Sequence, residues 1–184
     1  VDSFKEKIPY DISQTNFYLY TYPRWQCLTL TLGASADFYK EDEQHRSDRD
    51  LDKNQLNPKL GIAWNAVTDT TLRAAAFRTL KRTLLMDQTI EPTQVAGFNQ
   101  FYDDFNGTEA WNYGLGIDQK LTSNLFAGVE GIKRDLSVPY LSAPTFPATQ
   151  YQLGNVDWKE YLSRAYIYWA PLNWISLTAE YQFE

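Results

Sequence analysis

The sequence predicts an all-β protein: an antiparallel, up-and-down transmembrane β-barrel, or part of one, with about eight strands, short periplasmic turns and long external loops. Three observations predict this fold. Apolar and polar residues alternate in repeated segments, and tight turns alternate with long connections. Aromatic residues make up 16% of the chain although its mean hydropathy is −0.48. Strands with one lipid-facing and one lumen-facing side give this combination, because the two sides average out.

The composition limits the function. A length of 184 residues suits a single β-barrel segment spanning residues 1–184, and a net charge of −6 argues against a nucleic-acid partner. One cysteine, Cys27, and one histidine, His45, exclude an intrachain disulfide, a cysteine-based metal cluster and Ser-His-Asp catalysis. No apolar run is long enough for a transmembrane helix. Catalytic and phosphate-binding motifs are absent from the sequence, and we predict no enzyme activity, cofactor or metal site.

Alternation and turn residues mark the first two hairpins. Every second residue is apolar from Leu28 to Phe38, and again from Leu60 to Ala66. Pro and Asp occupy the short connections, where tight turns favour them. We expect these four strands at 16–22, 28–38, 60–67 and 71–78, joined in pairs by turns at 23–26 and 68–70.

The last two hairpins carry the same signal. Apolar residues alternate from Trp111 to Ile117, and the segment ISLTAEYQFE (175–184) alternates without a break. Apolar residues at helical spacing between capping residues are absent, so we predict no helix. We expect these four strands at 111–120, 125–134, 161–170 and 175–184, joined in pairs by turns at 121–124 and 171–173.

The other connections are long, and all fall at the opposite ends of the strands, at 39–57, 80–110 and 136–159. Short turns at one end and long loops at the other are typical of outer-membrane barrels. Segment 39–57 is densely charged with both signs, and segment 136–159 contains three prolines. We expect both to be exposed external loops.

The tryptophans lie towards the ends of the predicted strands. Four of them are at or near the tight turns (Trp25, Trp64, Trp169 and Trp174), and two are near the long loops (Trp111 and Trp158). This distribution resembles the two interfacial girdles of a membrane barrel. In a soluble β-sandwich the tryptophans would instead belong to the core, towards the middle of the strands.

The polar faces of the strands carry charges. In a barrel we expect four of these residues to face the lumen: Arg73, Glu130, Arg164 and Glu180. In a soluble two-layer protein the same residues would lie on a solvated outer face.

The segment 80–110 is the most distinctive of the long connections. It contains Phe101, Tyr102, Asp103, Asp104 and Phe105, and an aromatic and acidic external loop of this kind suits contact with a ligand. The alternative is a loop that packs its aromatic side chains over the mouth of the barrel. The acidic residues lack the spacing of an EF-hand calcium loop, so we predict no metal site there.

Two stretches resemble a known family. The hairpin LNPKLGIAWNAVTDTTLRAAAFRTLKR and the stretch QTIEPTQVAGFNQFYDDFNGTEAWNYGLGIDQKL are similar to hairpins of TonB-dependent outer-membrane receptors. Similar barrels also occur fused to tetratricopeptide-repeat proteins. The resemblance covers residues 16–184. It implies an outer-membrane location, contact with the lipid bilayer, and a role in recognition and uptake of a small-molecule or carbohydrate ligand.

The chain also departs from that family. Receptors of the family carry a plug domain, a coupling box and 22 strands, none of which matches this chain, so we expect a fragment whose partner is the remaining part of the barrel. One alternative is a complete eight-stranded outer-membrane barrel with a structural or adhesive role. Another alternative is a soluble β-sandwich that binds a small ligand or carbohydrate.

Overall fold

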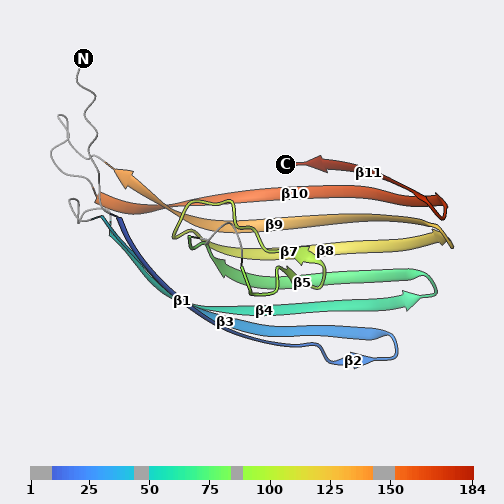
Figure 1. Cartoon of the computed structure of the whole chain (residues 1–184), viewed down its shortest axis with the longest axis horizontal. Coiled ribbons are helices and arrows are strands. Elements are labelled where there is room, and N and C mark those ends of the chain that lie inside the picture. The colour runs from blue at the N-terminus through green and yellow to red at the C-terminus, as the bar shows by residue number, and fades with distance from the viewer. Residues whose placement is uncertain (1–9, 44–49, 84–88, 143–151) are drawn as a thin grey trace, which may run out of the picture.

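One large antiparallel sheet dominates the computed structural model, which describes residues 10–43, 50–83, 89–142 and 152–184 (Figure 1). Neighbouring strands follow each other in chain order. The short strand β2 (Arg24–Trp25) pairs with β3 beside this path. The long strands are, in sheet order, β1 (Tyr10–Thr21), β3 (Leu28–Glu43), β4 (Leu51–Val67), β5 (Thr70–Leu80), β8 (Glu109–Thr122), β9 (Leu125–Ser142), β10 (Gln152–Leu172) and β11 (Ile175–Phe183).

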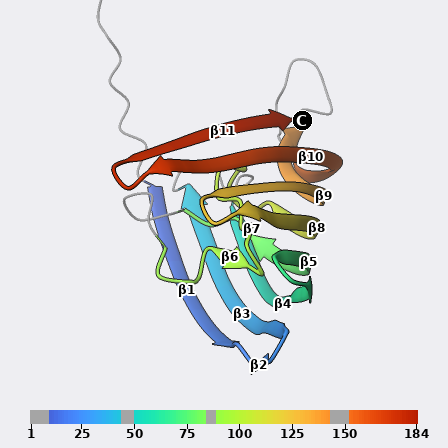
Figure 2. The same cartoon turned by 90° about the vertical axis from the view of Figure 1, so that its right-hand side faces the viewer.

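The all-β antiparallel architecture is confirmed, and each of the eight predicted segments overlaps one long strand. The sheet is strongly curled but not closed, since β1 and β11 each pair with a single strand among the described residues (Figure 2). The described residues do not form the two facing sheets of a sandwich. They also contain no helix of the length and apolarity that crossing a membrane requires.

Two of the long loops predicted from the sequence, 39–57 and 136–159, were wrong, because most of their described residues belong to strands. In the first, β3 continues to Glu43 and β4 begins at Leu51. In the second, β9 and β10 remain paired, from Leu136 opposite Trp158 to Ser142 opposite Gln152. Charged residues remove the alternation at 40–43, and Pro139 favours a loop at 136–142, although Leu136 and Val138 still alternate with Ser137 there. Backbone pairing continues without the apolar signal because ladder hydrogen bonds do not depend on side-chain polarity.

The four tight connections lie together at one end of the sheet (Figure 1). They are two-residue links after β2, β4, β8 and β10, close to the predicted turns. The link between β4 and β5 contains Asp69 with a φ of 65°, a left-handed conformation that Asp tolerates better than most residues. The first predicted turn is displaced, because Arg24 and Trp25 already pair with β3.

Burial in this sheet is the reverse of that in a soluble protein. Lys59 is 1% exposed, whereas its neighbour Leu60, on the opposite face, is 54% exposed. The same holds in β8, where Asn112 is fully buried and Leu115 is 71% exposed. The concave face is therefore covered and largely polar, with buried apolar clusters around Phe77 and Leu136, and the convex face is apolar and open.

A small hairpin covers the concave face. It consists of β6 (Gln94–Val95) and β7 (Phe98–Asn99), and it lies inside the curl of the sheet (Figure 2). Its Val95 and Phe98 are fully buried against Ala75 and Phe77 of β5. This hairpin belongs to the predicted loop 80–110, and sequence alternation did not reveal it because each of its strands has only two residues.

Glycines in the large sheet make room for the hairpin. A Cβ atom on Gly114 would lie 2.6 Å from the Phe98 ring, and one on Gly61 would lie 2.7 Å from the Ala96 Cβ. Distances this short are not tolerated between carbon atoms, so both positions require glycine for the hairpin to lie where it does.

All six tryptophans are exposed, so none belongs to a core. Side chains along a strand alternate between the two faces, and this alternation places Trp64, Trp111 and Trp169 on the convex apolar face. Trp158 is different, because it pairs with the buried Leu136 and has the parity of the concave face. A girdle on the convex face would therefore not include Trp158, because position along the strand does not decide which face a side chain occupies.

Candidate functional site

The four charged residues that we expected on one face of the strands meet on the concave face. Arg73 lies on β5, Glu130 on β9, Arg164 on β10 and Glu180 on β11. All four side chains belong to the same face, because the antiparallel register of the sheet aligns these positions across the strands. Ion pairs link them into one chain of charges across these strands.

Arg73 makes the most contacts in this network. Its guanidinium binds Asp118 at 2.5 Å and Glu130 at 2.9 Å, and it donates a hydrogen bond to the Tyr166 hydroxyl at 3.0 Å. Tyr166 in turn donates to Asp118. Two carboxylates and a phenol oxygen thus neutralise and fix a largely buried arginine, which is the condition under which a buried charge is tolerated.

Arg164 continues the network towards β11. It binds Glu130 at 3.2 Å and Glu180 at 2.8 Å, and it donates to the Tyr168 hydroxyl at 3.0 Å. Glu130 is therefore shared between the two arginines and is itself buried. The arrangement holds rigid, alternating charges along the concave face.

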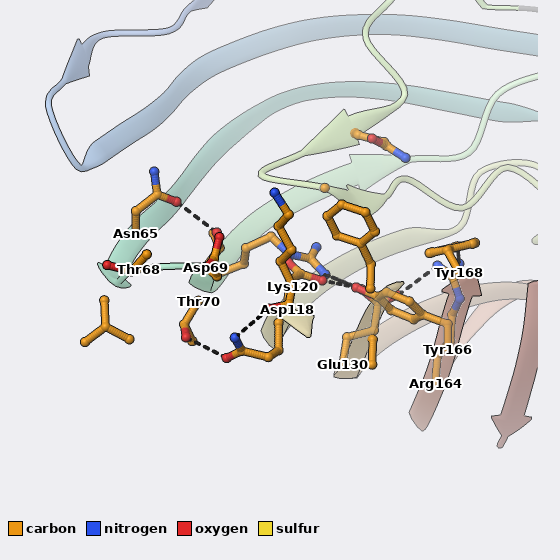
Figure 3. A pocket seen from close by; sticks show the side chains of 18 residues that line it. Asn65, Thr68, Asp69, Thr70, Asp118, Lys120, Glu130, Arg164, Tyr166 and Tyr168 are labelled. Carbon is orange, nitrogen blue, oxygen red and sulfur yellow. Dashed lines mark hydrogen bonds and ion pairs between the residues drawn. The ribbon is translucent and has the colours of Figure 1, made fainter. Parts of the chain in front are cut away.

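An open cleft of about 780 Å³ lies beside this network at the tight-turn end of the sheet (Figure 3). The hairpin contributes Gln94 and Gly97 to its wall, the latter from its tip. We call it the turn-end cleft. Its other lining residues include Asn65, Asp69, Thr70, Arg73, Asp118, Gln119, Lys120, Phe126, Glu130, Arg164, Tyr166 and Tyr168.

A second buried polar cluster fastens the segment before the hairpin to the sheet. Glu91 pairs with Lys59 at 3.4 Å and with Arg82 at 3.5 Å, and it accepts a hydrogen bond from the Tyr20 hydroxyl at 2.7 Å. Arg82 also binds Asp37 at 3.1 Å. Side chains from β1, from β4 and from the segment after β5 therefore converge on one glutamate of the loop.

The five loop residues expected to contact a ligand divide into two groups. Phe101 lies under the Arg134 guanidinium, 4.3 Å from its ring centroid, and Asp104 pairs with the same arginine at 2.5 Å. Asp103 and Phe105 are exposed. These contacts fasten the loop to β9 and leave only part of it available to a ligand.

Tyr102, the fifth of these residues, belongs to neither group and is half-buried. Burial, reinforced by the nearby Glu91 carboxylate, raises the pKa of the Tyr102 phenol above its ordinary value. The side chain is therefore neutral at physiological pH.

Sequence reasoning missed several members of the two clusters. Tyr166 lies two residues after the predicted Arg164, on the same face of β10, so strand alternation was a usable signal for it. Glu91 had no such signal, because it lies outside the sheet and reaches Lys59 only through the fold of the loop. His45 lies outside the described residues. Within those residues, no group of three His, Cys, Asp or Glu side chains could hold a metal ion.

Comparison with protein-family models, with curated proteins and with solved structures found no match to this chain. The functional argument therefore rests on the geometry of the sheet, the hairpin and the two charged clusters.

Proposed function

We propose that this chain forms part of the wall of an outer-membrane β-barrel that works as a receptor or transporter for a ligand. The observation that carries this proposal is the reversed burial of the sheet. A convex face of exposed leucine, isoleucine, valine and aromatic side chains is unfavourable in water but suits contact with lipid. The polar concave face then lines the interior of the barrel. Reversed burial also argues against the soluble sandwich.

The length of the strands supports a membrane location. Strands β4, β9 and β10 have 17, 18 and 21 residues, more than a tilted strand needs to cross the hydrocarbon core, about 9 to 11 residues. Each strand can cross the membrane and extend beyond it on the side of the long connections. The charged extensions of β3 and β4 fit this external position.

The hairpin favours a barrel larger than eight strands. The interior of an eight-stranded barrel is just wide enough for side chains to fill. Here the concave face also accommodates two further strands, and stacked β-layers need about 10 Å of separation. We therefore infer that other strands complete the sheet beside β1 and β11, because lipid does not tolerate unpaired edges. This argues for a receptor-type barrel and against the complete eight-stranded alternative.

The inner face supports a role in recognising a ligand and letting it pass. Paired charges on five neighbouring strands, β5 and β8 to β11, line it, and the hairpin narrows it from within. A polar lumen partly filled by a folded loop is a feature of outer-membrane barrels that select what passes. The resemblance to TonB-dependent receptors is consistent with this arrangement.

The proposal is tested by locating the native polypeptide in fractionated cells. We expect it in the outer-membrane fraction, resistant to alkaline extraction and released by detergent, with a mass above the 21.3 kDa of this chain. Recovery in the soluble fraction would contradict a membrane location. A membrane species of the same mass as this chain would favour the eight-stranded alternative.

A matched pair of substitutions tests which face meets lipid. Leu115→Arg places a charge at the centre of the exposed face of β8, where the cost in lipid is about 2–4 kcal/mol. Ser123→Arg places the same charge in the adjacent tight turn. We expect only Leu115→Arg to reduce insertion into lipid vesicles. Equal insertion of the two variants would place Leu115 in water.

A further inference from the structure

The turn-end cleft has the size of a small-ligand site and lies apart from the aromatic loop at 101–105. Its volume of about 780 Å³ falls within the range of ligand pockets, roughly 300–1,000 Å³. The hairpin tip forms one wall and the link between β4 and β5 forms another. We propose that this cleft binds an uncharged saccharide. This inference rests on the proposed function, since it assumes that the concave face lines the path of a ligand.

The charges of the cleft argue against an ionic ligand. Three basic and three acidic side chains line it, so their formal charges cancel. The two arginines are already bound to carboxylates at 2.5 to 3.2 Å. To reach either arginine, an anionic ligand would have to displace Glu130 or Asp118, and to reach those carboxylates a cationic ligand would have to displace the arginine itself. Lys120, the third basic residue, lies over the Phe126 ring with its ammonium 5.9 Å from the centroid. A neutral ligand leaves every pair intact.

The neutral groups of the cleft suit a ligand with many hydroxyls. Asn65, Gln94 and Gln119 each carry an amide that both donates and accepts hydrogen bonds, and Thr70 adds a hydroxyl with the same property. A sugar hydroxyl is also both a donor and an acceptor, so it can be satisfied by groups of this kind at several angles. The amide oxygen of Gln119 accepts from Thr70 at 2.6 Å and its amide nitrogen donates to the Lys120 carbonyl oxygen at 3.1 Å, which fixes the side chain and leaves one amide hydrogen for a ligand.

The cleft also offers apolar surface for the carbon face of a sugar ring. Phe126 and Val67 line it, and their side chains are 44% and 64% exposed. The face of an aromatic ring is electron-rich, so it attracts the polarised C–H groups of a pyranose as well as the Lys120 ammonium that lies over the Phe126 ring. Exposed apolar groups beside amides and hydroxyls thus match the two kinds of surface that a saccharide presents.

Calorimetric titration of the native protein in detergent tests the ligand class. The probes are the neutral trisaccharides maltotriose, cellotriose and xylotriose, with anionic trigalacturonate for comparison. We expect at least one neutral probe to bind, and we expect Gln119→Ala and Phe126→Ala each to weaken its binding by about tenfold. Gln26→Ala, which removes the same side chain from another tight turn at the same end of the sheet, should leave binding unchanged.

Three results would overturn the inference: no neutral probe binds, trigalacturonate binds more tightly, or Gln119→Ala and Gln26→Ala behave alike. Flotation of the same preparation with lipid vesicles separates this inference from the proposed function. A protein that floats but binds no neutral probe contradicts the saccharide site alone. A protein that does not float contradicts the membrane location on which the inference rests.

Discussion

The guanidinium of Arg73 lies over the ring of Phe98, 4.9 Å from its centroid, and so joins the sheet to the hairpin inside it. The same guanidinium binds two carboxylates of the concave network and approaches the Ala96 carbonyl oxygen at 3.4 Å. One side chain therefore contributes both to the charge network and to the position of the hairpin. Energetic coupling between the two follows from this geometry.

Replacing Arg73 by methionine should destabilise the protein strongly. The substitution keeps an apolar side chain next to Phe98 but leaves Asp118 and Glu130 without their shared cation, and breaking a buried pair in this way costs about 3–5 kcal/mol. The free energy of unfolding in urea, measured in detergent micelles, checks this. Arg24→Met, at an exposed arginine of β2, serves as control and should change stability by no more than about 0.5 kcal/mol. Similar values for the two variants would contradict the role of Arg73.

Adding a methyl group at Gly114 should displace the hairpin. The new Cβ would lie 2.6 Å from the Phe98 ring, and overpacking of this kind costs about 1–3 kcal/mol. Gly131→Ala is the matched control, because its nearest neighbour would be the Leu162 carbonyl oxygen at 3.9 Å. Limited proteolysis between residues 89 and 100 should accelerate in Gly114→Ala and not in Gly131→Ala. Unchanged cleavage in both would show that the hairpin does not rest against Gly114.

The pair of Lys59 and Glu91 should behave non-additively in a double-mutant cycle. Lys59→Met leaves the Glu91 carboxylate buried without its lysine, although Arg82 remains at 3.5 Å. Glu91→Gln removes the negative charge, so the double variant should recover part of the stability that Lys59→Met loses. Urea unfolding of the two single variants and the double variant measures the coupling, which we expect to exceed about 0.5 kcal/mol. Additive losses would mean that the pair contributes no direct interaction.

The loop should lose stability at alkaline pH through Tyr102. Because the folded-state pKa of this phenol is raised, folding favours its neutral form. The stabilisation is complete below the ordinary pKa of about 10 and is lost as the pH rises from there towards the raised value. Tyr102→Phe cannot ionise and should lose less stability between about pH 9 and pH 11. The difference between the two proteins isolates Tyr102, and parallel curves would contradict a buried phenol.

The strand centres were predictable because alternation is a local property. Leu28 to Phe38 and Ile175 to Phe183 show their faces in the sequence, and the structure pairs them accordingly. The strand extensions at 39–43 and 136–142 were missed, since charged residues remove the alternation in the first and Pro139 favours a loop in the second, while the backbone ladder continues in both. Strand alternation alone predicted that one face carries Arg73, Glu130, Arg164 and Glu180. Which carboxylate binds which arginine depends on the register between the strands.

The sequence by itself determined an antiparallel all-β chain with one apolar and one polar face, because residue alternation and turn chemistry act over a few neighbouring positions. Only the tertiary structure decided that the sheet curls without closing, that residues 94–99 pack inside it, and that Glu91 reaches Lys59. These features depend on contacts between residues far apart in the chain. Their energies come from burial and charge pairing in three dimensions, and local alternation carries no information about them.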